Sequence, residues 1–296
     1  MLLYDYFHLK EADFVNVELK NDNKIFVDPF LISIEESSFS KMAANSIRDY
    51  FKALLKSARD GNKRMSKALL ENLHERNETR TGYSVAKPKG IGFAGDAGED
   101  LFNNIIKSKA MKTNMISDIF DCSIMVDRVG ADKISDLIIN IIFLQLIEYT
   151  QKQCRKNRIP LSPVVLRYKI WNYKTFSWEK VVVELPLDED DNPIVFLPKE
   201  IASDKMFYDY QRVYNTLMIP FYEQVEIQDA SSGLVKILKS GKRKVLKKDL
   251  RAKYPCTKAE VVKFVQENNQ VYARYKKNQF TYVTSKNLRT NKWSIR

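Results

Sequence analysis

Apolar and polar residues change their spacing several times along this chain, and each spacing predicts a different element. Apolar residues on both sides of the polar stretch 20–23 favour a hairpin within the first forty residues. Between about Ser40 and Leu73 apolar residues recur at helical spacing, and the break Asp60-Gly61-Asn62 divides this stretch into two helices. The N-terminal part therefore predicts a hairpin followed by a helix pair.

The middle of the chain combines loop, helix and strand signals. Residues 74–98 hold five of the nine glycines, so we expect a long loop there, followed by a helix over 97–111. Strict alternation of apolar and polar residues over 120–126 predicts a strand. Gly130 precedes the strongest helical pattern, which we expect to run from Ala131 to about Cys154.

Runs of β-forming residues follow the long helix, separated by turn signals. The last two runs flank an acidic turn over 188–193 and predict a second hairpin. A helical stretch over about 206–216 is expected to end before Pro220, because proline interrupts the helical hydrogen-bond ladder. The predicted strands are 164–171, 181–185 and 194–197. Together these patterns predict an α+β fold in which helices pack on a mixed or antiparallel sheet.

The charge distribution divides the chain in two. Residues 236–296 carry 18 Lys and Arg against three acids, a net charge of +15, whereas the whole chain carries +12 and the first 235 residues sum to −3. We interpret this as a core domain over residues 1–225 and a small basic module over 234–296. Such a module favours contact with a polyanion, because each Lys or Arg placed on a phosphate releases a condensed counterion.

The basic module has elements of its own. The sequence predicts a hairpin whose basic tip lies at 240–243, and a helix over 257–267 with Thr257 as its cap. Aromatic residues then alternate with basic residues. This pattern is typical of surfaces on which the bases of a single strand stack or which contact duplex phosphates, and also of a small domain with an aromatic core. These rings are Tyr272, Tyr275, Phe280, Tyr282 and Trp293. The candidate nucleic-acid-binding residues are Lys242, Arg243, Lys244, Lys247, Lys248, Arg251, Arg274, Lys276 and Lys277.

Acidic residues upstream are candidates for catalysis. Nucleases of the restriction-enzyme type place a helix acid beside a strand acid around a metal ion. Glu99 and Asp121 match these two positions, but the chain lacks a Glu-x-Lys element on a following strand. The candidate catalytic residues are Glu78, Glu99, Asp121, Asp132 and Asp136. Of these, Asp121, Asp132 and Asp136 are candidate ligands of Mg²⁺, which prefers oxygen donors. The structural alternative is that Asp132 caps a helix and Asp136 is solvated.

Two further polar positions leave a structural role and a pocket role open. Asn140 lies among apolar residues, so we expect it to be buried and hydrogen-bonded. His74 opens a polar segment that offers a metal or acid–base cluster, a phosphate clamp formed by Arg76 and Arg80, or simply a charged helix end. The glycines at 90–95 lack the ending of a nucleotide-binding P-loop.

The composition narrows the class of protein. Three widely spaced cysteines argue against a disulfide framework and against a zinc site. The longest apolar stretch, 137–147, is about half a membrane span, and the first residues lack the features of a signal peptide. We therefore expect a soluble cytoplasmic protein without membrane contact.

Three stretches resemble parts of a family of uncharacterised bacterial proteins met near mobile elements or phage-defence genes. They read HERNETRTGYSVAKPKGIG, VGADKISDLIINIIFLQLIEYTQKQC and NPIVFLPKEI. The resemblance covers about the first two thirds of the chain and implies a role in defence by association, without a fold, an activity or a residue role.

These patterns lead to one functional hypothesis and its rivals. The first is a nucleic-acid-directed protein, a metal-dependent nuclease of a bacterial defence system, with Mg²⁺ held by the acids and the polyanion held by the tail. The alternative is a non-enzymatic subunit that binds nucleic acid or protein partners within a larger complex. A third is an enzyme that acts on a nucleotide-sized ligand in the 74–98 loop.

Overall fold

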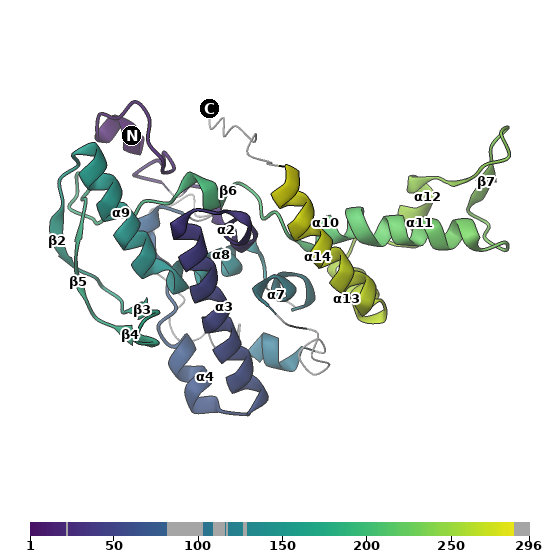
Figure 1. The fold of residues 1–296 in the computed structure, drawn as a ribbon, viewed down its shortest axis with the longest axis horizontal. Helices are drawn as coiled ribbons and strands as arrows, with labels where there is room; N and C mark the ends of the chain where they lie inside the picture. The colour runs from purple at the N-terminus through teal and green to yellow at the C-terminus, as the bar shows by residue number, and fades with distance from the viewer. Residues whose placement is uncertain (22, 82–102, 109–115, 117, 127–128, 287–296) are drawn as a thin grey trace.

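Helices and small antiparallel sheets form an α+β protein with an arm that extends from its body (Figure 1). The computed structural model describes residues 1–21, 23–81, 103–108, 116, 118–126 and 129–286. Within these residues the sheets are two-stranded and antiparallel, and the helices supply most of the packing. The predicted α+β class is thus confirmed.

The N-terminal region contains the predicted helix pair. Helices α3 (Ser38–Arg59) and α4 (Lys63–Leu70) are joined at Gly61, whose φ of +63° suits glycine. Asn62 caps α4 by accepting a hydrogen bond from the Met65 amide at 3.0 Å. The other elements here are α1 (Leu3–Tyr6), β1 (Phe26–Val27), α2 (Pro29–Ile34) and the 3-10 helix η1 (Asn77–Thr79).

The predicted N-terminal hairpin is wrong, because its two halves bond to other parts of the chain. Strand β1 pairs with β6 (Ala202–Ser203), and Phe14 forms a bridge with Pro198. The Val17 carbonyl accepts from the Leu3 amide at 2.8 Å. Distant segments therefore take the backbone hydrogen bonds that a local hairpin would have used.

The predicted strand at 120–126 is also wrong, since these residues form helix α7 (Ile119–Met125). Asp118 accepts hydrogen bonds from the Phe120 and Asp121 amides at 3.0 and 3.2 Å. The Asp121 side chain accepts in return from the Asp118 amide at 3.3 Å. This reciprocal capping box satisfies free amides at the helix start and outweighs the alternating pattern. Of the helix expected over 97–111, the described residues 103–107 are helical.

The long helical pattern after Gly130 forms two helices, α8 (Ala131–Ile141) and α9 (Phe143–Asn157). The chain bends at Ile142, whose amide still bonds to the Ile138 carbonyl at 3.0 Å. Ile142 is fully buried, so the bend redirects the chain inside the core without exposing apolar surface.

The strands after α9 form two short ribbons. The predicted strand 164–171 is divided between β2 (Ser162–Val165) and β3 (Ile170–Asn172). Strand β2 pairs with β5 (Val182–Leu185), and β3 pairs with β4 (Ser177–Glu179). The predicted strand at 194–197 is not one, because the Val195 amide bonds to the Glu78 carbonyl and the Phe196 amide to the Thr150 hydroxyl.

The C-terminal region begins with a continuous helix that does not stop before Pro220. Helix α10 (Tyr210–Val213), the π-helical turn η3 (Tyr214–Met218) and α11 (Ile219–Gln228) follow one another directly. Pro220 lies in the first turn of α11, where the wider π-helical turn accommodates a residue without an amide hydrogen.

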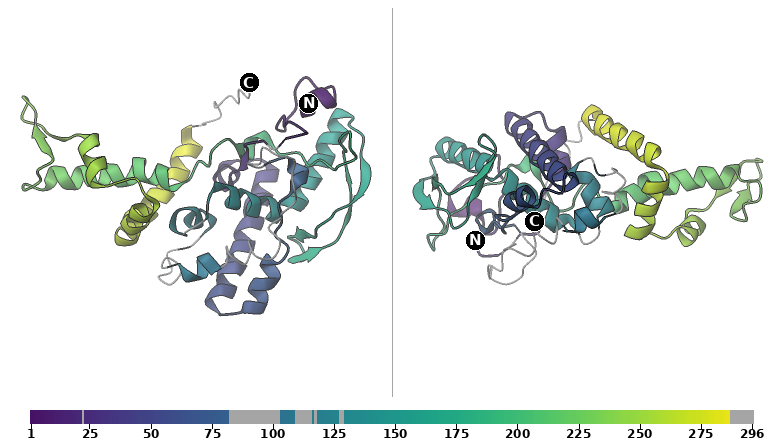
Figure 2. Two further views of the ribbon diagram at one scale, coloured as in Figure 1. Left: turned by 180° about the vertical axis from the view of Figure 1, so that it is seen from behind. Right: turned by 90° about the horizontal axis from the view of Figure 1, so that it is seen from below.

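Beyond α11 the sequence predicted both the basic hairpin and the capped helix. Strands β7 (Val235–Ile237) and β8 (Arg243–Val245) pair, with Gly241 at a φ of +77° in their turn. Thr257 caps α13 (Lys258–Glu267) by accepting from the Glu260 amide. The remaining elements are η2 (Lys199–Ile201), α12 (Lys247–Lys253) and α14 (Asn269–Lys286). Figure 2 shows α11, α12 and the hairpin extending away from the body, while α13 and α14 return to it.

Candidate nucleic-acid interface

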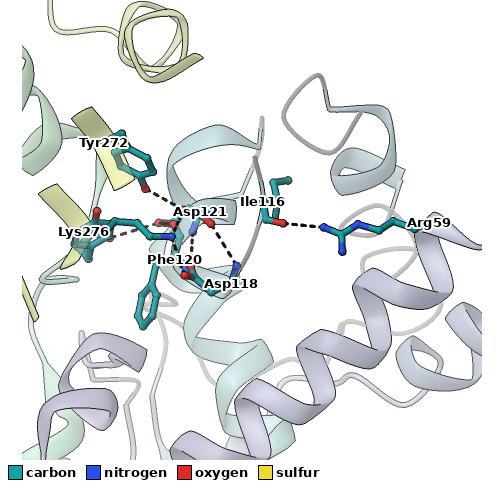
Figure 3. A network of polar contacts seen from close by, with 9 residues as sticks. Arg59, Ile116, Asp118, Phe120, Asp121, Tyr272 and Lys276 are labelled. Carbon is teal, nitrogen blue, oxygen red and sulfur yellow. Dashed lines mark hydrogen bonds and ion pairs between the residues drawn. The ribbon is translucent and has the colours of Figure 1, made fainter. Parts of the chain in front are cut away.

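A buried ion pair joins the C-terminal region to the body (Figure 3). Lys276 of α14 lies 2.8 Å from both Asp118 Oδ2 and Asp121 Oδ1. Tyr272, one turn earlier, donates to Asp121 Oδ1 at 3.0 Å. The Asp121 side chain is 0% exposed and that of Lys276 is 15% exposed. Lys276 and Asp121 are thus largely removed from water, while Asp118, which is 35% exposed, lies at the edge of the site.

The charged groups in this site shift one another's pKa values. Burial raises the pKa of Asp118, the neighbouring Asp121 raises it further, and Lys276 opposes both. Burial acts to lower the pKa of Lys276, but the two carboxylates outweigh it and hold that pKa above its ordinary value. Lys276 therefore stays protonated, and its role differs from the predicted contact with nucleic acid because its charge faces inward. Asp121 was predicted to bind a metal ion, but its carboxylate faces the ammonium group of Lys276.

The remaining predicted catalytic acids are spread over several elements. Asp132 is exposed in the first turn of α8, and Asp136 is partly buried one turn later. Burial, followed by the charges of Glu75 and Asp132, raises the pKa of Asp136 to about 7. Glu78 lies on η1, and Glu99 lies outside the described residues. Among the residues that the structure describes, no three His, Cys, Asp or Glu side chains are grouped to hold a metal.

Asn140 is buried and hydrogen-bonded, as the sequence predicted, and it braces the chain before the glycine-rich segment. Its amide nitrogen donates to the His74 carbonyl at 2.6 Å, and its oxygen accepts from Arg76 Nε at 2.8 Å. Arg76 is 3% exposed and donates to the Lys169 carbonyl at 2.6 Å. The His74 ring stacks on Tyr168 with centroids 3.8 Å apart. This arrangement supports the structural alternative for His74 and Asn140.

The two arginines of the predicted phosphate clamp also bond inside the protein. The Arg76 guanidinium lies over the Phe143 ring at 4.4 Å, where burial lowers its pKa to about 10. Arg80 forms an ion pair with Asp188 at 2.6 Å, and both side chains are nearly buried. Asp188 belongs to the acidic turn seen in the sequence, but the turn gave no indication of a partner 108 residues away. These arginines organise the core.

A cavity of about 540 Å³ lies where α8, the segment before α10 and the start of α13 meet. Asp132 lies at its wall, as do Asp209 and Lys258. Asp209 accepts from the Arg212 amide at 2.7 Å as the cap of α10, and Lys258 Nζ donates to the Val129 carbonyl at 3.1 Å. Helix capping and chain bracing therefore account for two of its charged groups.

We define the basic arm as β7, β8, their turn and α12 (residues 235–253). Most of its charged side chains are exposed, unlike the buried charges described above. At its base Lys253 pairs with Glu226 at 2.6 Å, and Arg243 donates to the Asp229 carbonyl at 2.8 Å. Further out, exposed lysines form no ion pair with any residue in the described part of the chain. These are Lys236, Lys239, Lys242, Lys244, Lys247 and Lys248.

The remaining residues predicted to contact nucleic acid differ in how exposed their side chains are. Arg251 is exposed and donates to Asn215, while Arg274 and Lys277 are exposed on α14. Tyr272 and Tyr275 are 4% and 8% exposed, because Tyr272 bonds to Asp121 and the Tyr275 hydroxyl to that of Thr216. Neither ring is open to stack on bases. The side chains of Phe280, Tyr282 and Trp293 lie outside the described part.

These features define an α+β protein with paired charges in its interior and a basic arm whose outer lysines form no ion pair within the described residues. The chain belongs to the family described as "Domain of unknown function (DUF8370)", whose model matches residues 7–209. No curated protein and no solved structure matches the chain. The family match ends one residue before α10, so the basic arm lies outside it. None of the described helices combines the length and apolar character needed to cross a membrane.

Proposed function

We propose that this protein binds nucleic acid through the basic arm, as a binding protein and not through a catalytic site of its own. The supporting observation is the group of six exposed lysines that form no ion pair with the residues that the structure describes. Lys236 and Lys244 lie directly opposite each other on β7 and β8, a placement of like charges that destabilises a hairpin by itself. A phosphate backbone relieves this repulsion and releases counterions as it binds.

The place of these charges supports the same proposal. The arm extends from the body, so a long polyanion can reach it without meeting the rest of the surface (Figure 1). Residues 1–235 sum to a net charge of −3, whereas the arm alone carries nine Lys and Arg against one acid. A location inside the cell, where nucleic acid is present, is part of this proposal.

A binding titration with matched variants tests the proposal. We expect the quadruple variant with glutamine at Lys242, Lys244, Lys247 and Lys248 to bind a labelled duplex far more weakly. The slope of log affinity against log salt should fall by roughly 3 to 4, about 0.9 per lost phosphate contact. The control carries glutamine at four exposed lysines of α3 and α4 and should bind like wild type: Lys41, Lys52, Lys56 and Lys67. Equal affinities and slopes for both variants would refute the proposal.

The metal-dependent nuclease stays a prediction that the same material can test. Incubation of the protein with labelled DNA and RNA, with and without Mg²⁺, detects any cleavage. Asp136 and Asp132 are the predicted ligands that remain outside the buried ion pair. Cleavage by wild type that Asp136→Ala abolishes would replace binding with catalysis as the function, whereas binding without cleavage is the outcome we expect.

A further inference from the structure

The basic arm also exposes aliphatic side chains, which a purely electrostatic surface does not need. Ile237 at the end of β7 is 75% exposed, Leu238 is 42% exposed and Leu246 is 37% exposed. Ile237 is therefore the most exposed large apolar side chain among the described residues. It lies between Lys236 and Lys239, so any partner that covers it must also accept positive charge.

The register of the hairpin explains why Ile237 is exposed. Val235 pairs with Val245, and Ile237 pairs with Arg243, so these two pairs share one face of the ribbon. Near the body this face is buried, since Val245 is 1% exposed and β8 contacts α11. Further out on the same face, Ile237 is 75% exposed among the described residues. Lys236 and Lys244 occupy the opposite face.

Aliphatic groups favour a duplex over a single strand. Proteins that bind single strands without sequence preference stack the bases on exposed aromatic rings. In the described side chains from Tyr210 to Gln279 no aromatic ring is exposed, because Tyr272 and Tyr275 are buried and Tyr222 stacks on Tyr254 at 3.8 Å. Groove binding needs no such ring, since aliphatic side chains contact thymine methyl groups and base edges.

The shape of the arm narrows the duplex to B-form DNA. The major groove of B-form DNA, about 12 Å wide, admits a two-stranded β-ribbon. The deep, narrow major groove of an A-form RNA helix does not admit side chains. A membrane surface fits less well, because interfacial binding relies on a broad apolar face with tryptophan or phenylalanine, whereas the arm offers a few scattered aliphatic residues.

We infer that β7 and β8 enter the major groove of B-form DNA, where Ile237 contacts thymine methyl groups while Lys239 and Lys242 of the hairpin turn contact phosphates. This inference rests on the proposed function and names its partner and its mode. It assigns separate tasks to neighbouring residues: the charges supply salt-dependent affinity, and Ile237 supplies a salt-independent part.

The test compares Ile237→Ala with wild type on short duplexes of identical sequence that contain either thymine or uracil. Uracil lacks the methyl group, so wild type should bind the thymine duplex several-fold more tightly. Ile237→Ala should bind the thymine duplex roughly 5-fold more weakly than wild type, with an unchanged salt slope. The variant should also no longer distinguish thymine from uracil. Val165→Ala is the matched control, because Val165 is 74% exposed on β2 of the body.

Three further ligands distinguish a failure of the groove inference from a failure of the proposed function. A single strand of the same sequence, an RNA duplex and vesicles with anionic lipid should each bind more weakly than the DNA duplex. Tighter binding to any of these, or equal thymine preference in wild type and Ile237→Ala, would overturn the groove inference while leaving nucleic-acid binding intact. The absence of binding to every nucleic acid would overturn the proposed function as well.

Discussion

Lys276 and Lys244 belong to the same basic segment, but the structure gives them opposite environments. Lys276 lies between two carboxylates with 15% of its side chain exposed, whereas Lys244 is exposed beside other lysines on the basic arm. Removal of the first charge leaves two adjacent carboxylates without the ammonium group that offsets their repulsion, whereas we expect removal of the second to leave the fold intact. The net charge of a segment therefore does not report its function until each charge is placed.

The largest effect on stability is expected at the junction. Asp121→Asn removes a fully buried carboxylate from Lys276 and Tyr272, and it weakens the capping box of α7. We expect the free energy of unfolding to fall by about 3 kcal/mol, as for other broken buried ion pairs. Urea denaturation measures this change, with Lys244→Gln as the control that stays within about 0.5 kcal/mol of wild type. Similar losses in both variants would abolish the distinction between the two lysines.

A somewhat smaller loss is expected within the body. Asn140→Ala leaves the buried Arg76 Nε and the His74 carbonyl without their partner. Unfolding experiments should show a destabilisation of about 2 kcal/mol, the cost of orphaned buried polar groups. Asn45→Ala, at an exposed position of α3, should cost much less. If Asn140→Ala is as stable as that control, the bracing role of Asn140 is wrong.

The pH dependence of stability should show the smallest effect, at Asp136. Its pKa is raised to about 7 in the folded protein, while an unfolded aspartate has a pKa near 3.9. Between about pH 4 and pH 7 the folded state keeps a proton that the unfolded state has released, so this group lowers stability as the pH rises through that window.

Asparagine mimics the protonated carboxyl group, so Asp136→Asn should match wild type near pH 4. Above about pH 7 we expect it to be more stable by roughly 1 kcal/mol, a modest gain because the side chain keeps some contact with solvent. Thermal unfolding at a series of pH values tests this expectation. Parallel stability curves for the two proteins would show that Asp136 has an ordinary pKa.

Local signals in the sequence predicted some elements well and long-range pairing not at all. Gly61 and Thr257 mark helix boundaries through their own backbone chemistry, and both were located correctly. The alternation at 120–126 was misleading, because the cap at Asp118 decides the helix. Nothing near Lys276 indicates that its partner Asp121 lies 155 residues earlier.

The same limit applied to the candidate site. The basic hairpin could be located from its own residues, but the sequence does not distinguish the nine candidate bases from one another, because exposure depends on how distant helices pack. Ile237 was missed as a contact residue for the same reason. The register of β7 with β8 and the packing of α11 against Val245 decide which apolar side chain of the hairpin stays exposed, and the local sequence contains neither.

Lysine labelling read by mass spectrometry, with and without duplex DNA, tests the central claim most directly. The account predicts that Lys236, Lys242, Lys244, Lys247 and Lys248 react readily in the free protein and become protected when DNA binds. Lys276 should remain unreactive in both states, because it is held between Asp118 and Asp121. Arm lysines that react equally with and without bound DNA would contradict the account.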